Sequence, residues 1–282
     1  MWDKYWYYKL QSLPLKELNK STAIPGVSRS DVYPLEITLP PFPEQKRIAD
    51  KLDSVLARVD ACRDRLDRLP AQLKRFRQSI LAAATSGRLT EDWRDEHGLQ
   101  EPWLQMTVGD VCESSFYGPR FGKNEYTTSK TGIPTIRTTD MTDDGRIEIT
   151  ESTPRVAVPS NRIEHFRVQK GDLLVTRTGS IGVMAVFEAD YVAIPSAYLI
   201  RFRLAQSVLP RYVFFCLMAP IGQETLGLSS TAITQPNVNA EAIKRIEVLV
   251  PTKQEQTEII RRVEILFAFA DRLEARLAAA RR

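Results

Sequence analysis

The fold is decided by one stretch, residues 44–80, which reads EQKRIADKLDSVLARVDACRDRLDRLPAQLKRFRQSI. Its apolar residues recur at alternating spacings of four and three, and this pattern is a sustained heptad seam. The seam residues are Ile48, Leu52, Val55, Val59, Cys62, Leu66, Leu69, Leu73, Phe76 and Ile80. The pattern predicts a long amphipathic helix with a kink at Pro70 and a C-terminal stop at Ser86-Gly87.

A second helix near the end of the chain repeats this seam. Its residues are Ile259, Val263, Leu266, Ala270, Leu273, Leu277 and Ala280, each 211 positions after its counterpart in the first helix. The repeat extends upstream, where Ser21–Ile24 returns as Ser230–Ile233 and Leu35–Pro40 returns as Ile246–Pro251. A period of about 210 residues predicts the duplication of a domain together with its connecting helix.

Neither seam can stay uncovered in water, so we expect the two helices to pack against each other or against partner chains. An ordinary hairpin buried in a globular core is the alternative. The charged run between seam positions, Arg63–Arg68, favours a long exposed coiled coil over that alternative.

Residues 98–250 have a different character. Short runs rich in β-branched and aromatic residues are separated by Gly, Pro, Asn and Asp, which predicts strands joined by turns. The expected strands are Thr135–Thr138, Asp172–Thr176, Gly182–Phe187 and Tyr198–Phe202, and one amphipathic helix is expected at Pro210–Met218. The predicted fold class is α+β, with one strand- and loop-rich domain and two long coiled-coil helices packed antiparallel.

The predicted division of the chain has four parts: the distal remnant of a first globular domain at residues 1–42, a first helical spacer at 43–97, a globular domain at 98–250 and a second spacer at 251–282.

Composition excludes several classes of protein. The chain has 282 residues with 43% hydrophobic content and no run of 18 apolar residues, so we expect a soluble cytoplasmic protein with no membrane partner. Its three cysteines are too far apart in the sequence for a disulfide framework or a zinc cage, and no metal site or cofactor is predicted.

Catalysis by this chain is not expected either. Leu39-Pro40-Pro41-Phe42 lacks the leading Asn or Asp that an amino-methyltransferase loop needs, and Gly118–Lys123 is one residue too short for a phosphate-binding loop. No paired carboxylates followed by lysine and no nucleophile elbow are found. We therefore predict a protein that is not an enzyme.

Polar loops of the domain at 98–250 point instead to nucleic acid. Bulk charge does not, because this domain carries 15 basic and 16 acidic residues. Basic groups and hydroxyls suit phosphate oxygens, while Arg, Asn and Asp can read base edges. Three loops offer such groups, and the candidate DNA-binding residues are Arg120, Lys123, Asn124, Arg137, Thr138, Thr139, Asp140, Arg177, Thr178, Ser180, Ser230, Thr231, Gln235 and Asn237.

The chain resembles the specificity subunits of type I restriction-modification systems. The residues that carry the resemblance are Pro40–Ile48 opening the first helix, its weaker echo at Pro251–Ile259, and Ile80–Thr90 with Trp93 closing the first helix. Ile133–Arg137, Gly171–Leu174 and Ser230–Ile233 are similar to motifs of the family's target-recognition domain.

The resemblance implies a pattern of recognition domain and spacer helix repeated twice, from which most of the first recognition domain is missing here. It further implies that the domains read halves of a split DNA target, that the spacers hold them about 40 Å apart, and that methyltransferase (modification) and restriction subunits join them. S-adenosylmethionine and ATP would then belong to those partners.

Two other arrangements stay open. The chain could be a coiled-coil adaptor that binds modification or specificity subunits without reading DNA. It could also form a homodimer, since two copies would restore two recognition domains around a four-helix core.

Overall fold

The computed structural model describes residues 3–15, 17–18, 26–99, 101–177, 182–227 and 239–281. The fold is α+β, as predicted. Two compact units are distinguished, Met1–Ala71 and Gln72–Arg282. The first contains α1 (Asp3–Gln11), α2 (Arg29–Val32) and the first part of α3 (Phe42–Thr85).

In the first unit, a lysine and a tyrosine of α1 both bind one carboxylate of α3. Asp53 accepts hydrogen bonds from the ammonium of Lys4 and the hydroxyl of Tyr8, both at 2.5 Å. The hydrogen bond to Asp53 raises the pKa of Tyr8 to about 12. Tyr5 is buried in the same contact, and its hydroxyl donates to the carbonyl of Thr38.

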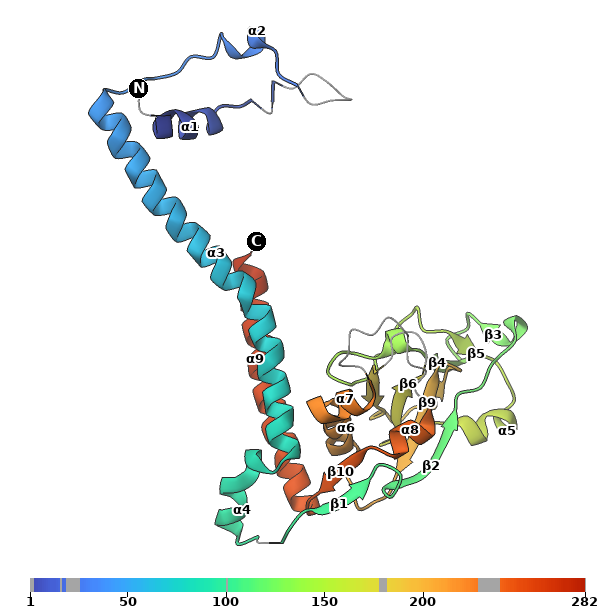
Figure 1. Cartoon of the computed structure of the whole chain (residues 1–282). Coiled ribbons are helices and arrows are strands. Elements are labelled where there is room, and N and C mark those ends of the chain that lie inside the picture. The colour runs from blue at the N-terminus through green and yellow to red at the C-terminus, as the bar shows by residue number, and fades with distance from the viewer. Residues whose placement is uncertain are drawn as a thin grey trace. The chain divides into compact units, whose positions relative to one another are not determined.

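The second unit contains the end of α3, the connector that follows it, the strands and α9 (Figure 1). Its helices are α4 (Glu91–His97), α5 (Ser160–Ile163), α6 (Pro210–Met218), α7 (Pro220–Thr225), α8 (Ala240–Lys244) and α9 (Lys253–Ala280). Short 3-10 turns are η1 (Arg88–Thr90), η2 (Lys123–Glu125), η3 (Thr138–Asp140) and η4 (Glu164–Phe166). Its strands are β1 (Leu104–Thr107), β2 (Cys112–Tyr117), β3 (Tyr126–Thr127), β4 (Ile133–Ile136), β5 (Arg155–Val156), β6 (Leu173–Thr176), β7 (Met184–Val186), β8 (Ile194–Pro195), β9 (Leu199–Leu204) and β10 (Glu247–Val250).

The strands of the described ranges form three sheets. One has the order β2-β9-β6-β7 and is antiparallel throughout, another has the order β3-β5-β4-β8, and β1 pairs with β10. The parallel β4–β8 pair sets Ile136 beside Pro195. Four strands and the helix α6 lie where the sequence predicts them, within two residues at either end.

The end of α3 and α9 pack antiparallel, as predicted. Arg77 of α3 binds Glu274 at 2.7 Å and Asp271 at 2.5 Å. Ile80, later in α3, belongs to the same core as Ile259, earlier in α9. Residue numbers thus rise along one helix as they fall along the other (Figure 1). Pro70 lies inside α3, and Gly87, with φ of +83°, follows its end as expected.

The seam is covered only in part. Leu73, Ile80, Ile259, Val263, Ala270 and Leu277 are buried; Ile48, Leu52, Leu66, Leu69, Leu266 and Leu273 are half-buried; Val55, Val59, Cys62, Phe76 and Ala280 are exposed. Ile80, Ile259 and Val263 belong to the main core of the globular domain. The expectation of a coiled coil exposed along its length is therefore wrong for the last turns of α3 and the first turns of α9.

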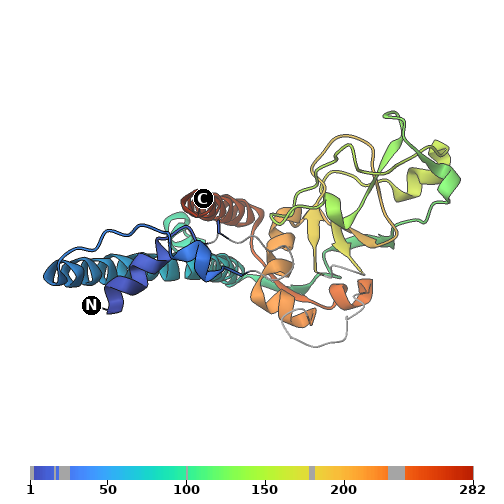
Figure 2. The ribbon, with the colours of Figure 1, turned by 90° about the horizontal axis from the view of Figure 1, so that it is seen from above.

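Side chains outside the seam explain this correction. Leu81 and Ala84 of α3 are buried in the same core, which also contains Phe214 and Phe215 of α6. Figure 2 shows α6 and α7 between the long helices and the strands. The end of α3 is thus apolar on more than one face.

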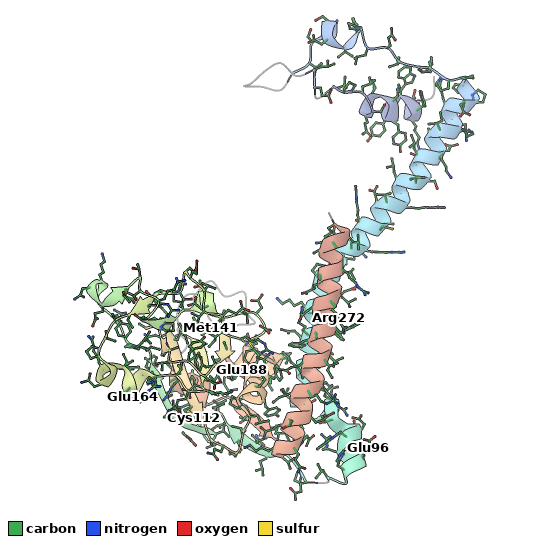
Figure 3. The ribbon with its side chains drawn as sticks, turned by 180° about the vertical axis from the view of Figure 1, so that it is seen from behind. Glu96, Cys112, Met141, Glu164, Glu188 and Arg272 are labelled. Atoms are coloured by element: carbon green, nitrogen blue, oxygen red, sulfur yellow. The ribbon has the colours of Figure 1, made fainter. Side chains whose placement is uncertain are left out.

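Ion pairs also attach the domain to α9. Glu264 lies 3.4 Å from Arg211 and 3.9 Å from Arg146, and Arg146 binds Glu188 as well. Glu188 is labelled in Figure 3. These contacts join the strand-containing domain to α9.

The predicted repeat is visible in the hydrogen bonds at the start of each long helix. The amide of Gln45 donates to the carbonyl of Pro40 at 2.9 Å, and the amide of Gln256, 211 residues later, donates to the carbonyl of Pro251 at 2.9 Å. Both glutamines are buried. The two copies therefore begin their helices in the same way.

The neighbouring glutamates differ between the copies. Glu255 is 2% exposed, and its carboxylate accepts hydrogen bonds from Thr90, Arg94 and the indole of Trp103. Its counterpart Glu44 binds Arg47 on its own helix and keeps 39% of its side chain exposed. Glu255 thus joins the connector after α3 to the start of α9.

Element bounds lie close to the predicted division: α3 begins at Phe42, α4 ends at His97, the strands lie between Leu104 and Val250, and α9 begins at Lys253. The division into four parts stays a prediction. None of the described helices combines the length and apolar composition that a membrane crossing requires.

Candidate nucleic-acid interface

The candidate interface is built on the antiparallel sheet β2-β9-β6-β7 and the loops that leave its strands. The register of its central strands sets Arg201 opposite both Phe116 and Leu174. The Arg201 guanidinium lies 4.1 Å from the Phe116 ring centroid and donates to Ser114. Burial lowers the pKa of this guanidinium.

A buried carboxylate balances that charge. Asp172 accepts two hydrogen bonds from Arg203, at 3.0 and 2.9 Å, and lies 3.5 Å from Arg201. Asp172 is 2% exposed and also receives the backbone N–H of Gln169. This network holds the strands in register, and it supports the loops rather than offering groups to a ligand.

Arg177 follows β6 and reaches the end of the sheet. Its backbone N–H donates to the carbonyl of Tyr198, and its guanidinium lies 4.8 Å from the ring centroid of Tyr117. Stacking on a tyrosine leaves the donors at the edge of a guanidinium available to an acceptor such as guanine or phosphate. Arg177 is half-buried, so it is held in place without being enclosed.

Two tyrosines flank this arginine. Tyr198 is 62% exposed and Tyr117 is 41% exposed. The two chain segments that carry these tyrosines approach closely, because a Cβ on Gly118 would overlap the carbonyl oxygen of Ser196. Tyr198 reads in the sequence as an ordinary strand residue, so its exposure was not predictable from the pattern.

The structure brings the end of the first predicted loop, residues 116–140, to the same end of the sheet as Arg177 of the second predicted loop. The hydroxyl of Thr138 lies 3.4 Å from that of Thr176, next to Arg177, and Thr139 is exposed. Two of the three predicted loops therefore meet.

Asp140 does not fit its predicted role. Its side chain is 1% exposed, and its oxygens accept hydrogen bonds from Arg137, from the backbone N–H of Arg137 and from Thr153. A carboxylate so enclosed cannot reach a base edge, so a DNA contact by Asp140 is incorrect for this conformation. The hydrogen bond that it accepts from the backbone N–H of Arg137 closes the turn η3.

Arg137 is also engaged within the protein. Besides Asp140, its guanidinium donates to the carbonyl of Ser152 at 3.0 Å, and 35% of the side chain stays exposed. It can offer its remaining edge to a ligand, although part of its hydrogen-bonding capacity is used.

The first predicted loop carries exposed basic groups. Arg120, Lys123 and Asn124 are all exposed, before β3 in the second sheet. Glu125, the acidic residue of this stretch, is paired with Arg162 and accepts the backbone N–H of Gly122. Within the described residues Arg120 and Lys123 form no ion pair, so their charge is available.

Six predicted residues lie outside the described residues: Thr178, Ser180, Ser230, Thr231, Gln235 and Asn237. In the described part of the chain, no group of three or more His, Cys, Asp or Glu side chains could hold a metal ion.

Sequence comparison identifies the family. Residues 2–71 and 100–280 match the model described as the type I restriction modification DNA specificity domain. Similar curated proteins are the specificity subunits of the type I restriction enzymes EcoBI and EcoKI from Escherichia coli, each 31% identical, and StySPI from Salmonella potsdam, 32% identical. Those matches cover 97%, 92% and 92% of this chain, but 60%, 56% and 56% of the relatives. The chain thus spans somewhat over half of their length.

Solved structures agree in fold. The HsdS subunit from Thermoanaerobacter tengcongensis superposes with a TM-score of 0.62 at 18% identity, covering 97% of this chain and 64% of that one. A structure from a study of assembly and conformational transition in the type I R-M system gives 0.66 at 19% identity, covering 99% and 64%. The chain therefore belongs to the type I restriction modification DNA specificity domain family.

Proposed function

We propose that the chain is a non-catalytic, sequence-specific DNA-recognition subunit of a type I restriction-modification complex. It would read part of a split DNA target through the domain at residues 98–250. Its partners would be double-stranded DNA, methyltransferase subunits docked on the spacer helices, and restriction subunits. A cytoplasmic location, where such a complex meets DNA, belongs to the same proposal.

One observation carries this proposal: Arg177 is stacked on Tyr117 at the end of the sheet, beside exposed Tyr198 and the threonine loop at Thr138. An arginine held by a ring, with hydroxyls next to it, suits recognition of a base edge flanked by phosphates. The free basic residues Arg120 and Lys123 add sequence-independent attraction to the backbone.

Duplex binding at several salt concentrations tests the proposal. If phosphates are contacted, the logarithm of the affinity should fall linearly with the logarithm of the salt concentration. The double variant Arg120→Ala/Lys123→Ala should make this slope shallower by about 2, since each phosphate contact contributes about 1. The adaptor alternative predicts no salt-dependent duplex binding at all.

The expected homodimer is a separate question. Sedimentation at increasing protein concentration tests it, because a mass that does not change with concentration excludes self-association.

A further inference from the structure

Tyr117, at the end of β2, contacts two segments that lie much later in the chain. The guanidinium carbon of Arg177 lies 4.8 Å from its ring centroid, and its hydroxyl oxygen accepts a hydrogen bond from the backbone N–H of Ala240 at 3.2 Å. Arg177 follows β6, and Ala240 is the first residue of α8, which lies beside β2 (Figure 1). One side chain therefore bridges the end of β6 and the start of α8.

Other contacts fix both ends of this bridge. Ala240 is 6% exposed, and the side chain of Asn239 caps α8 by accepting the N–H of Ala242 at 2.8 Å. At the other end, the backbone N–H of Arg177 donates to the carbonyl of Tyr198. The hydroxyl of the bridging tyrosine is thus attached to a capped helix, and its ring contacts an arginine whose backbone is held by the sheet.

An arginine on the opposite face of the sheet shows what is special about Arg177. Neighbouring residues of a strand point to opposite faces, so Phe116 and Tyr117 each hold an arginine on a different side of β2. Arg201, on Phe116, is 4% exposed and lies 3.5 Å from the carboxylate of Asp172. Arg177 is half-buried and, among the residues that the structure describes, forms no ion pair. Its charge is therefore available to a ligand, while its position depends on the tyrosine ring.

The ring limits the freedom of a long side chain. An arginine has several rotatable bonds, and ordering it only when a ligand arrives costs free energy. A guanidinium that is already held loses less freedom on binding, and its planar fork of donors points in one direction. The orientation of Arg177, and with it the base edge that the fork fits, thus depends on where the Tyr117 ring lies.

We propose that Tyr117 is a positioning residue that sets how strictly Arg177 selects a base. Its ring holds the guanidinium, and its hydrogen bond to Ala240 holds the ring. The inference rests on the proposed function, in which Arg177 contacts a base edge, and it adds the residue on which the precision of that contact depends.

Nuclear magnetic resonance of the intact chain without DNA tests whether Tyr117 holds Arg177. The Nε–Hε resonance of Arg177, identified by its loss in Arg177→Lys, should be shifted upfield by the ring. The shift should persist in Tyr117→Phe and disappear in Tyr117→Leu. The matched control is Tyr191→Leu, which removes a tyrosine that is 42% exposed and packs on Phe187, and it should leave the shift unchanged. The same Arg177 resonance in the native chain and in Tyr117→Leu would overturn the inference.

Selection from duplexes with a randomised segment tests the effect on base choice. Tyr117→Leu should weaken the preference about tenfold at the one position that Arg177→Ala also affects. Tyr117→Phe should weaken it about threefold, because the ring stays but loses its hydrogen bond to Ala240. The slope of log affinity against log salt should not change in either variant, since the charge of Arg177 remains. A loss of preference spread over all positions would indicate general damage to the domain and contradict the inference.

A double variant shows whether Tyr117 acts through the arginine. Tyr117→Leu/Arg177→Ala should select bases as loosely as Arg177→Ala alone and no more loosely. A further loss in the double variant would mean that Tyr117 contacts DNA directly, against the inference. If the native chain selects no sequence at all, the recognition proposal fails, whereas the Arg177 resonance still decides whether Tyr117 positions this arginine.

Discussion

Arg177 is the residue on which the proposed DNA recognition by the domain at residues 98–250 depends most directly. Arg177→Ala should lower the affinity for the preferred duplex by about 1–3 kcal/mol, the range for a lost bidentate guanine contact, and relax the base preference at one position. Selection on random duplexes measures both. The control is Arg276→Ala on α9, which removes an exposed arginine far along the chain from the loops. An unchanged base preference in Arg177→Ala would argue against this contact.

Glu255 of α9 accepts three hydrogen bonds from the connector that follows α3. Glu255→Ala leaves Thr90, Arg94 and Trp103 without their acceptor, so we expect a loss of about 3–5 kcal/mol in the free energy of unfolding. Urea denaturation followed by fluorescence measures it. The repeat supplies the control: Glu44→Ala removes an exposed pair and should cost less than about 1 kcal/mol. If both variants lost the same free energy of unfolding, the proposed difference between Glu255 and Glu44 would be refuted.

Residue-level errors in the sequence analysis have physical causes. Asp140 looks like any loop aspartate in sequence, but it is buried because Arg137 and Thr153 fold back onto it. Contacts between residues 13 apart in an irregular loop leave no periodic signal. Tyr198 was not among the predicted site residues. A strand pattern does not reveal which end of a sheet is exposed to solvent, so the 62% exposure of this side chain could not be predicted.

At the scale of elements, the pairing of α3 with α9 depends on the arginine between them. A double-mutant cycle on Arg77→Ala and Glu274→Ala should give a coupling of about 1 kcal/mol in the free energy of unfolding, because Arg77 is only 25% exposed. The pair Arg47 and Glu44, with an arginine 73% exposed, should couple more weakly. No coupling at Arg77 would mean that the register is set by apolar packing alone.

The start of α9 should also respond to pH. Hydrogen bonds from Arg261 and Arg262 lower the pKa of Glu258 from 4.5 to about 2. A carboxyl group whose pKa is lowered on folding stabilises the protein above its unfolded pKa, and that contribution is lost as the pH falls through the folded value. The Tm difference between the native chain and Glu258→Gln should therefore narrow from pH 6 to pH 3. A difference that stays constant over this range would contradict the assignment.

Elements were predictable where their pattern is periodic and long. The heptads predicted both long helices, and α6 was placed at its observed bounds. Phe76 is exposed and Leu81 buried, against the heptad pattern, because the end of α3 also contacts the globular core. The longer strands β1, β2 and β10 were not among the expected strands, and neither were the two-residue strands β3, β5 and β8, since so short a segment has no detectable alternation.

At the scale of the whole molecule, the chain combines two kinds of structure. The long helices carry apolar seams, which suit helical protein partners in the proposed complex. The domain at residues 98–250 carries the loops that we propose bind DNA. The chain belongs to the type I restriction modification DNA specificity domain family and spans only part of its relatives' length. The domain boundaries proposed from sequence would be tested by expressing residues 98–250 with the helix pair that completes their core.

The most direct test maps methylated adenines in DNA after co-expression of the chain with its cognate modification subunit. We predict methylation at one recurring sequence, which becomes less strictly defined in Arg177→Ala and disappears when the chain is omitted. Methylation that follows no sequence, or the same pattern without the chain, would contradict the claim that this protein selects the DNA target.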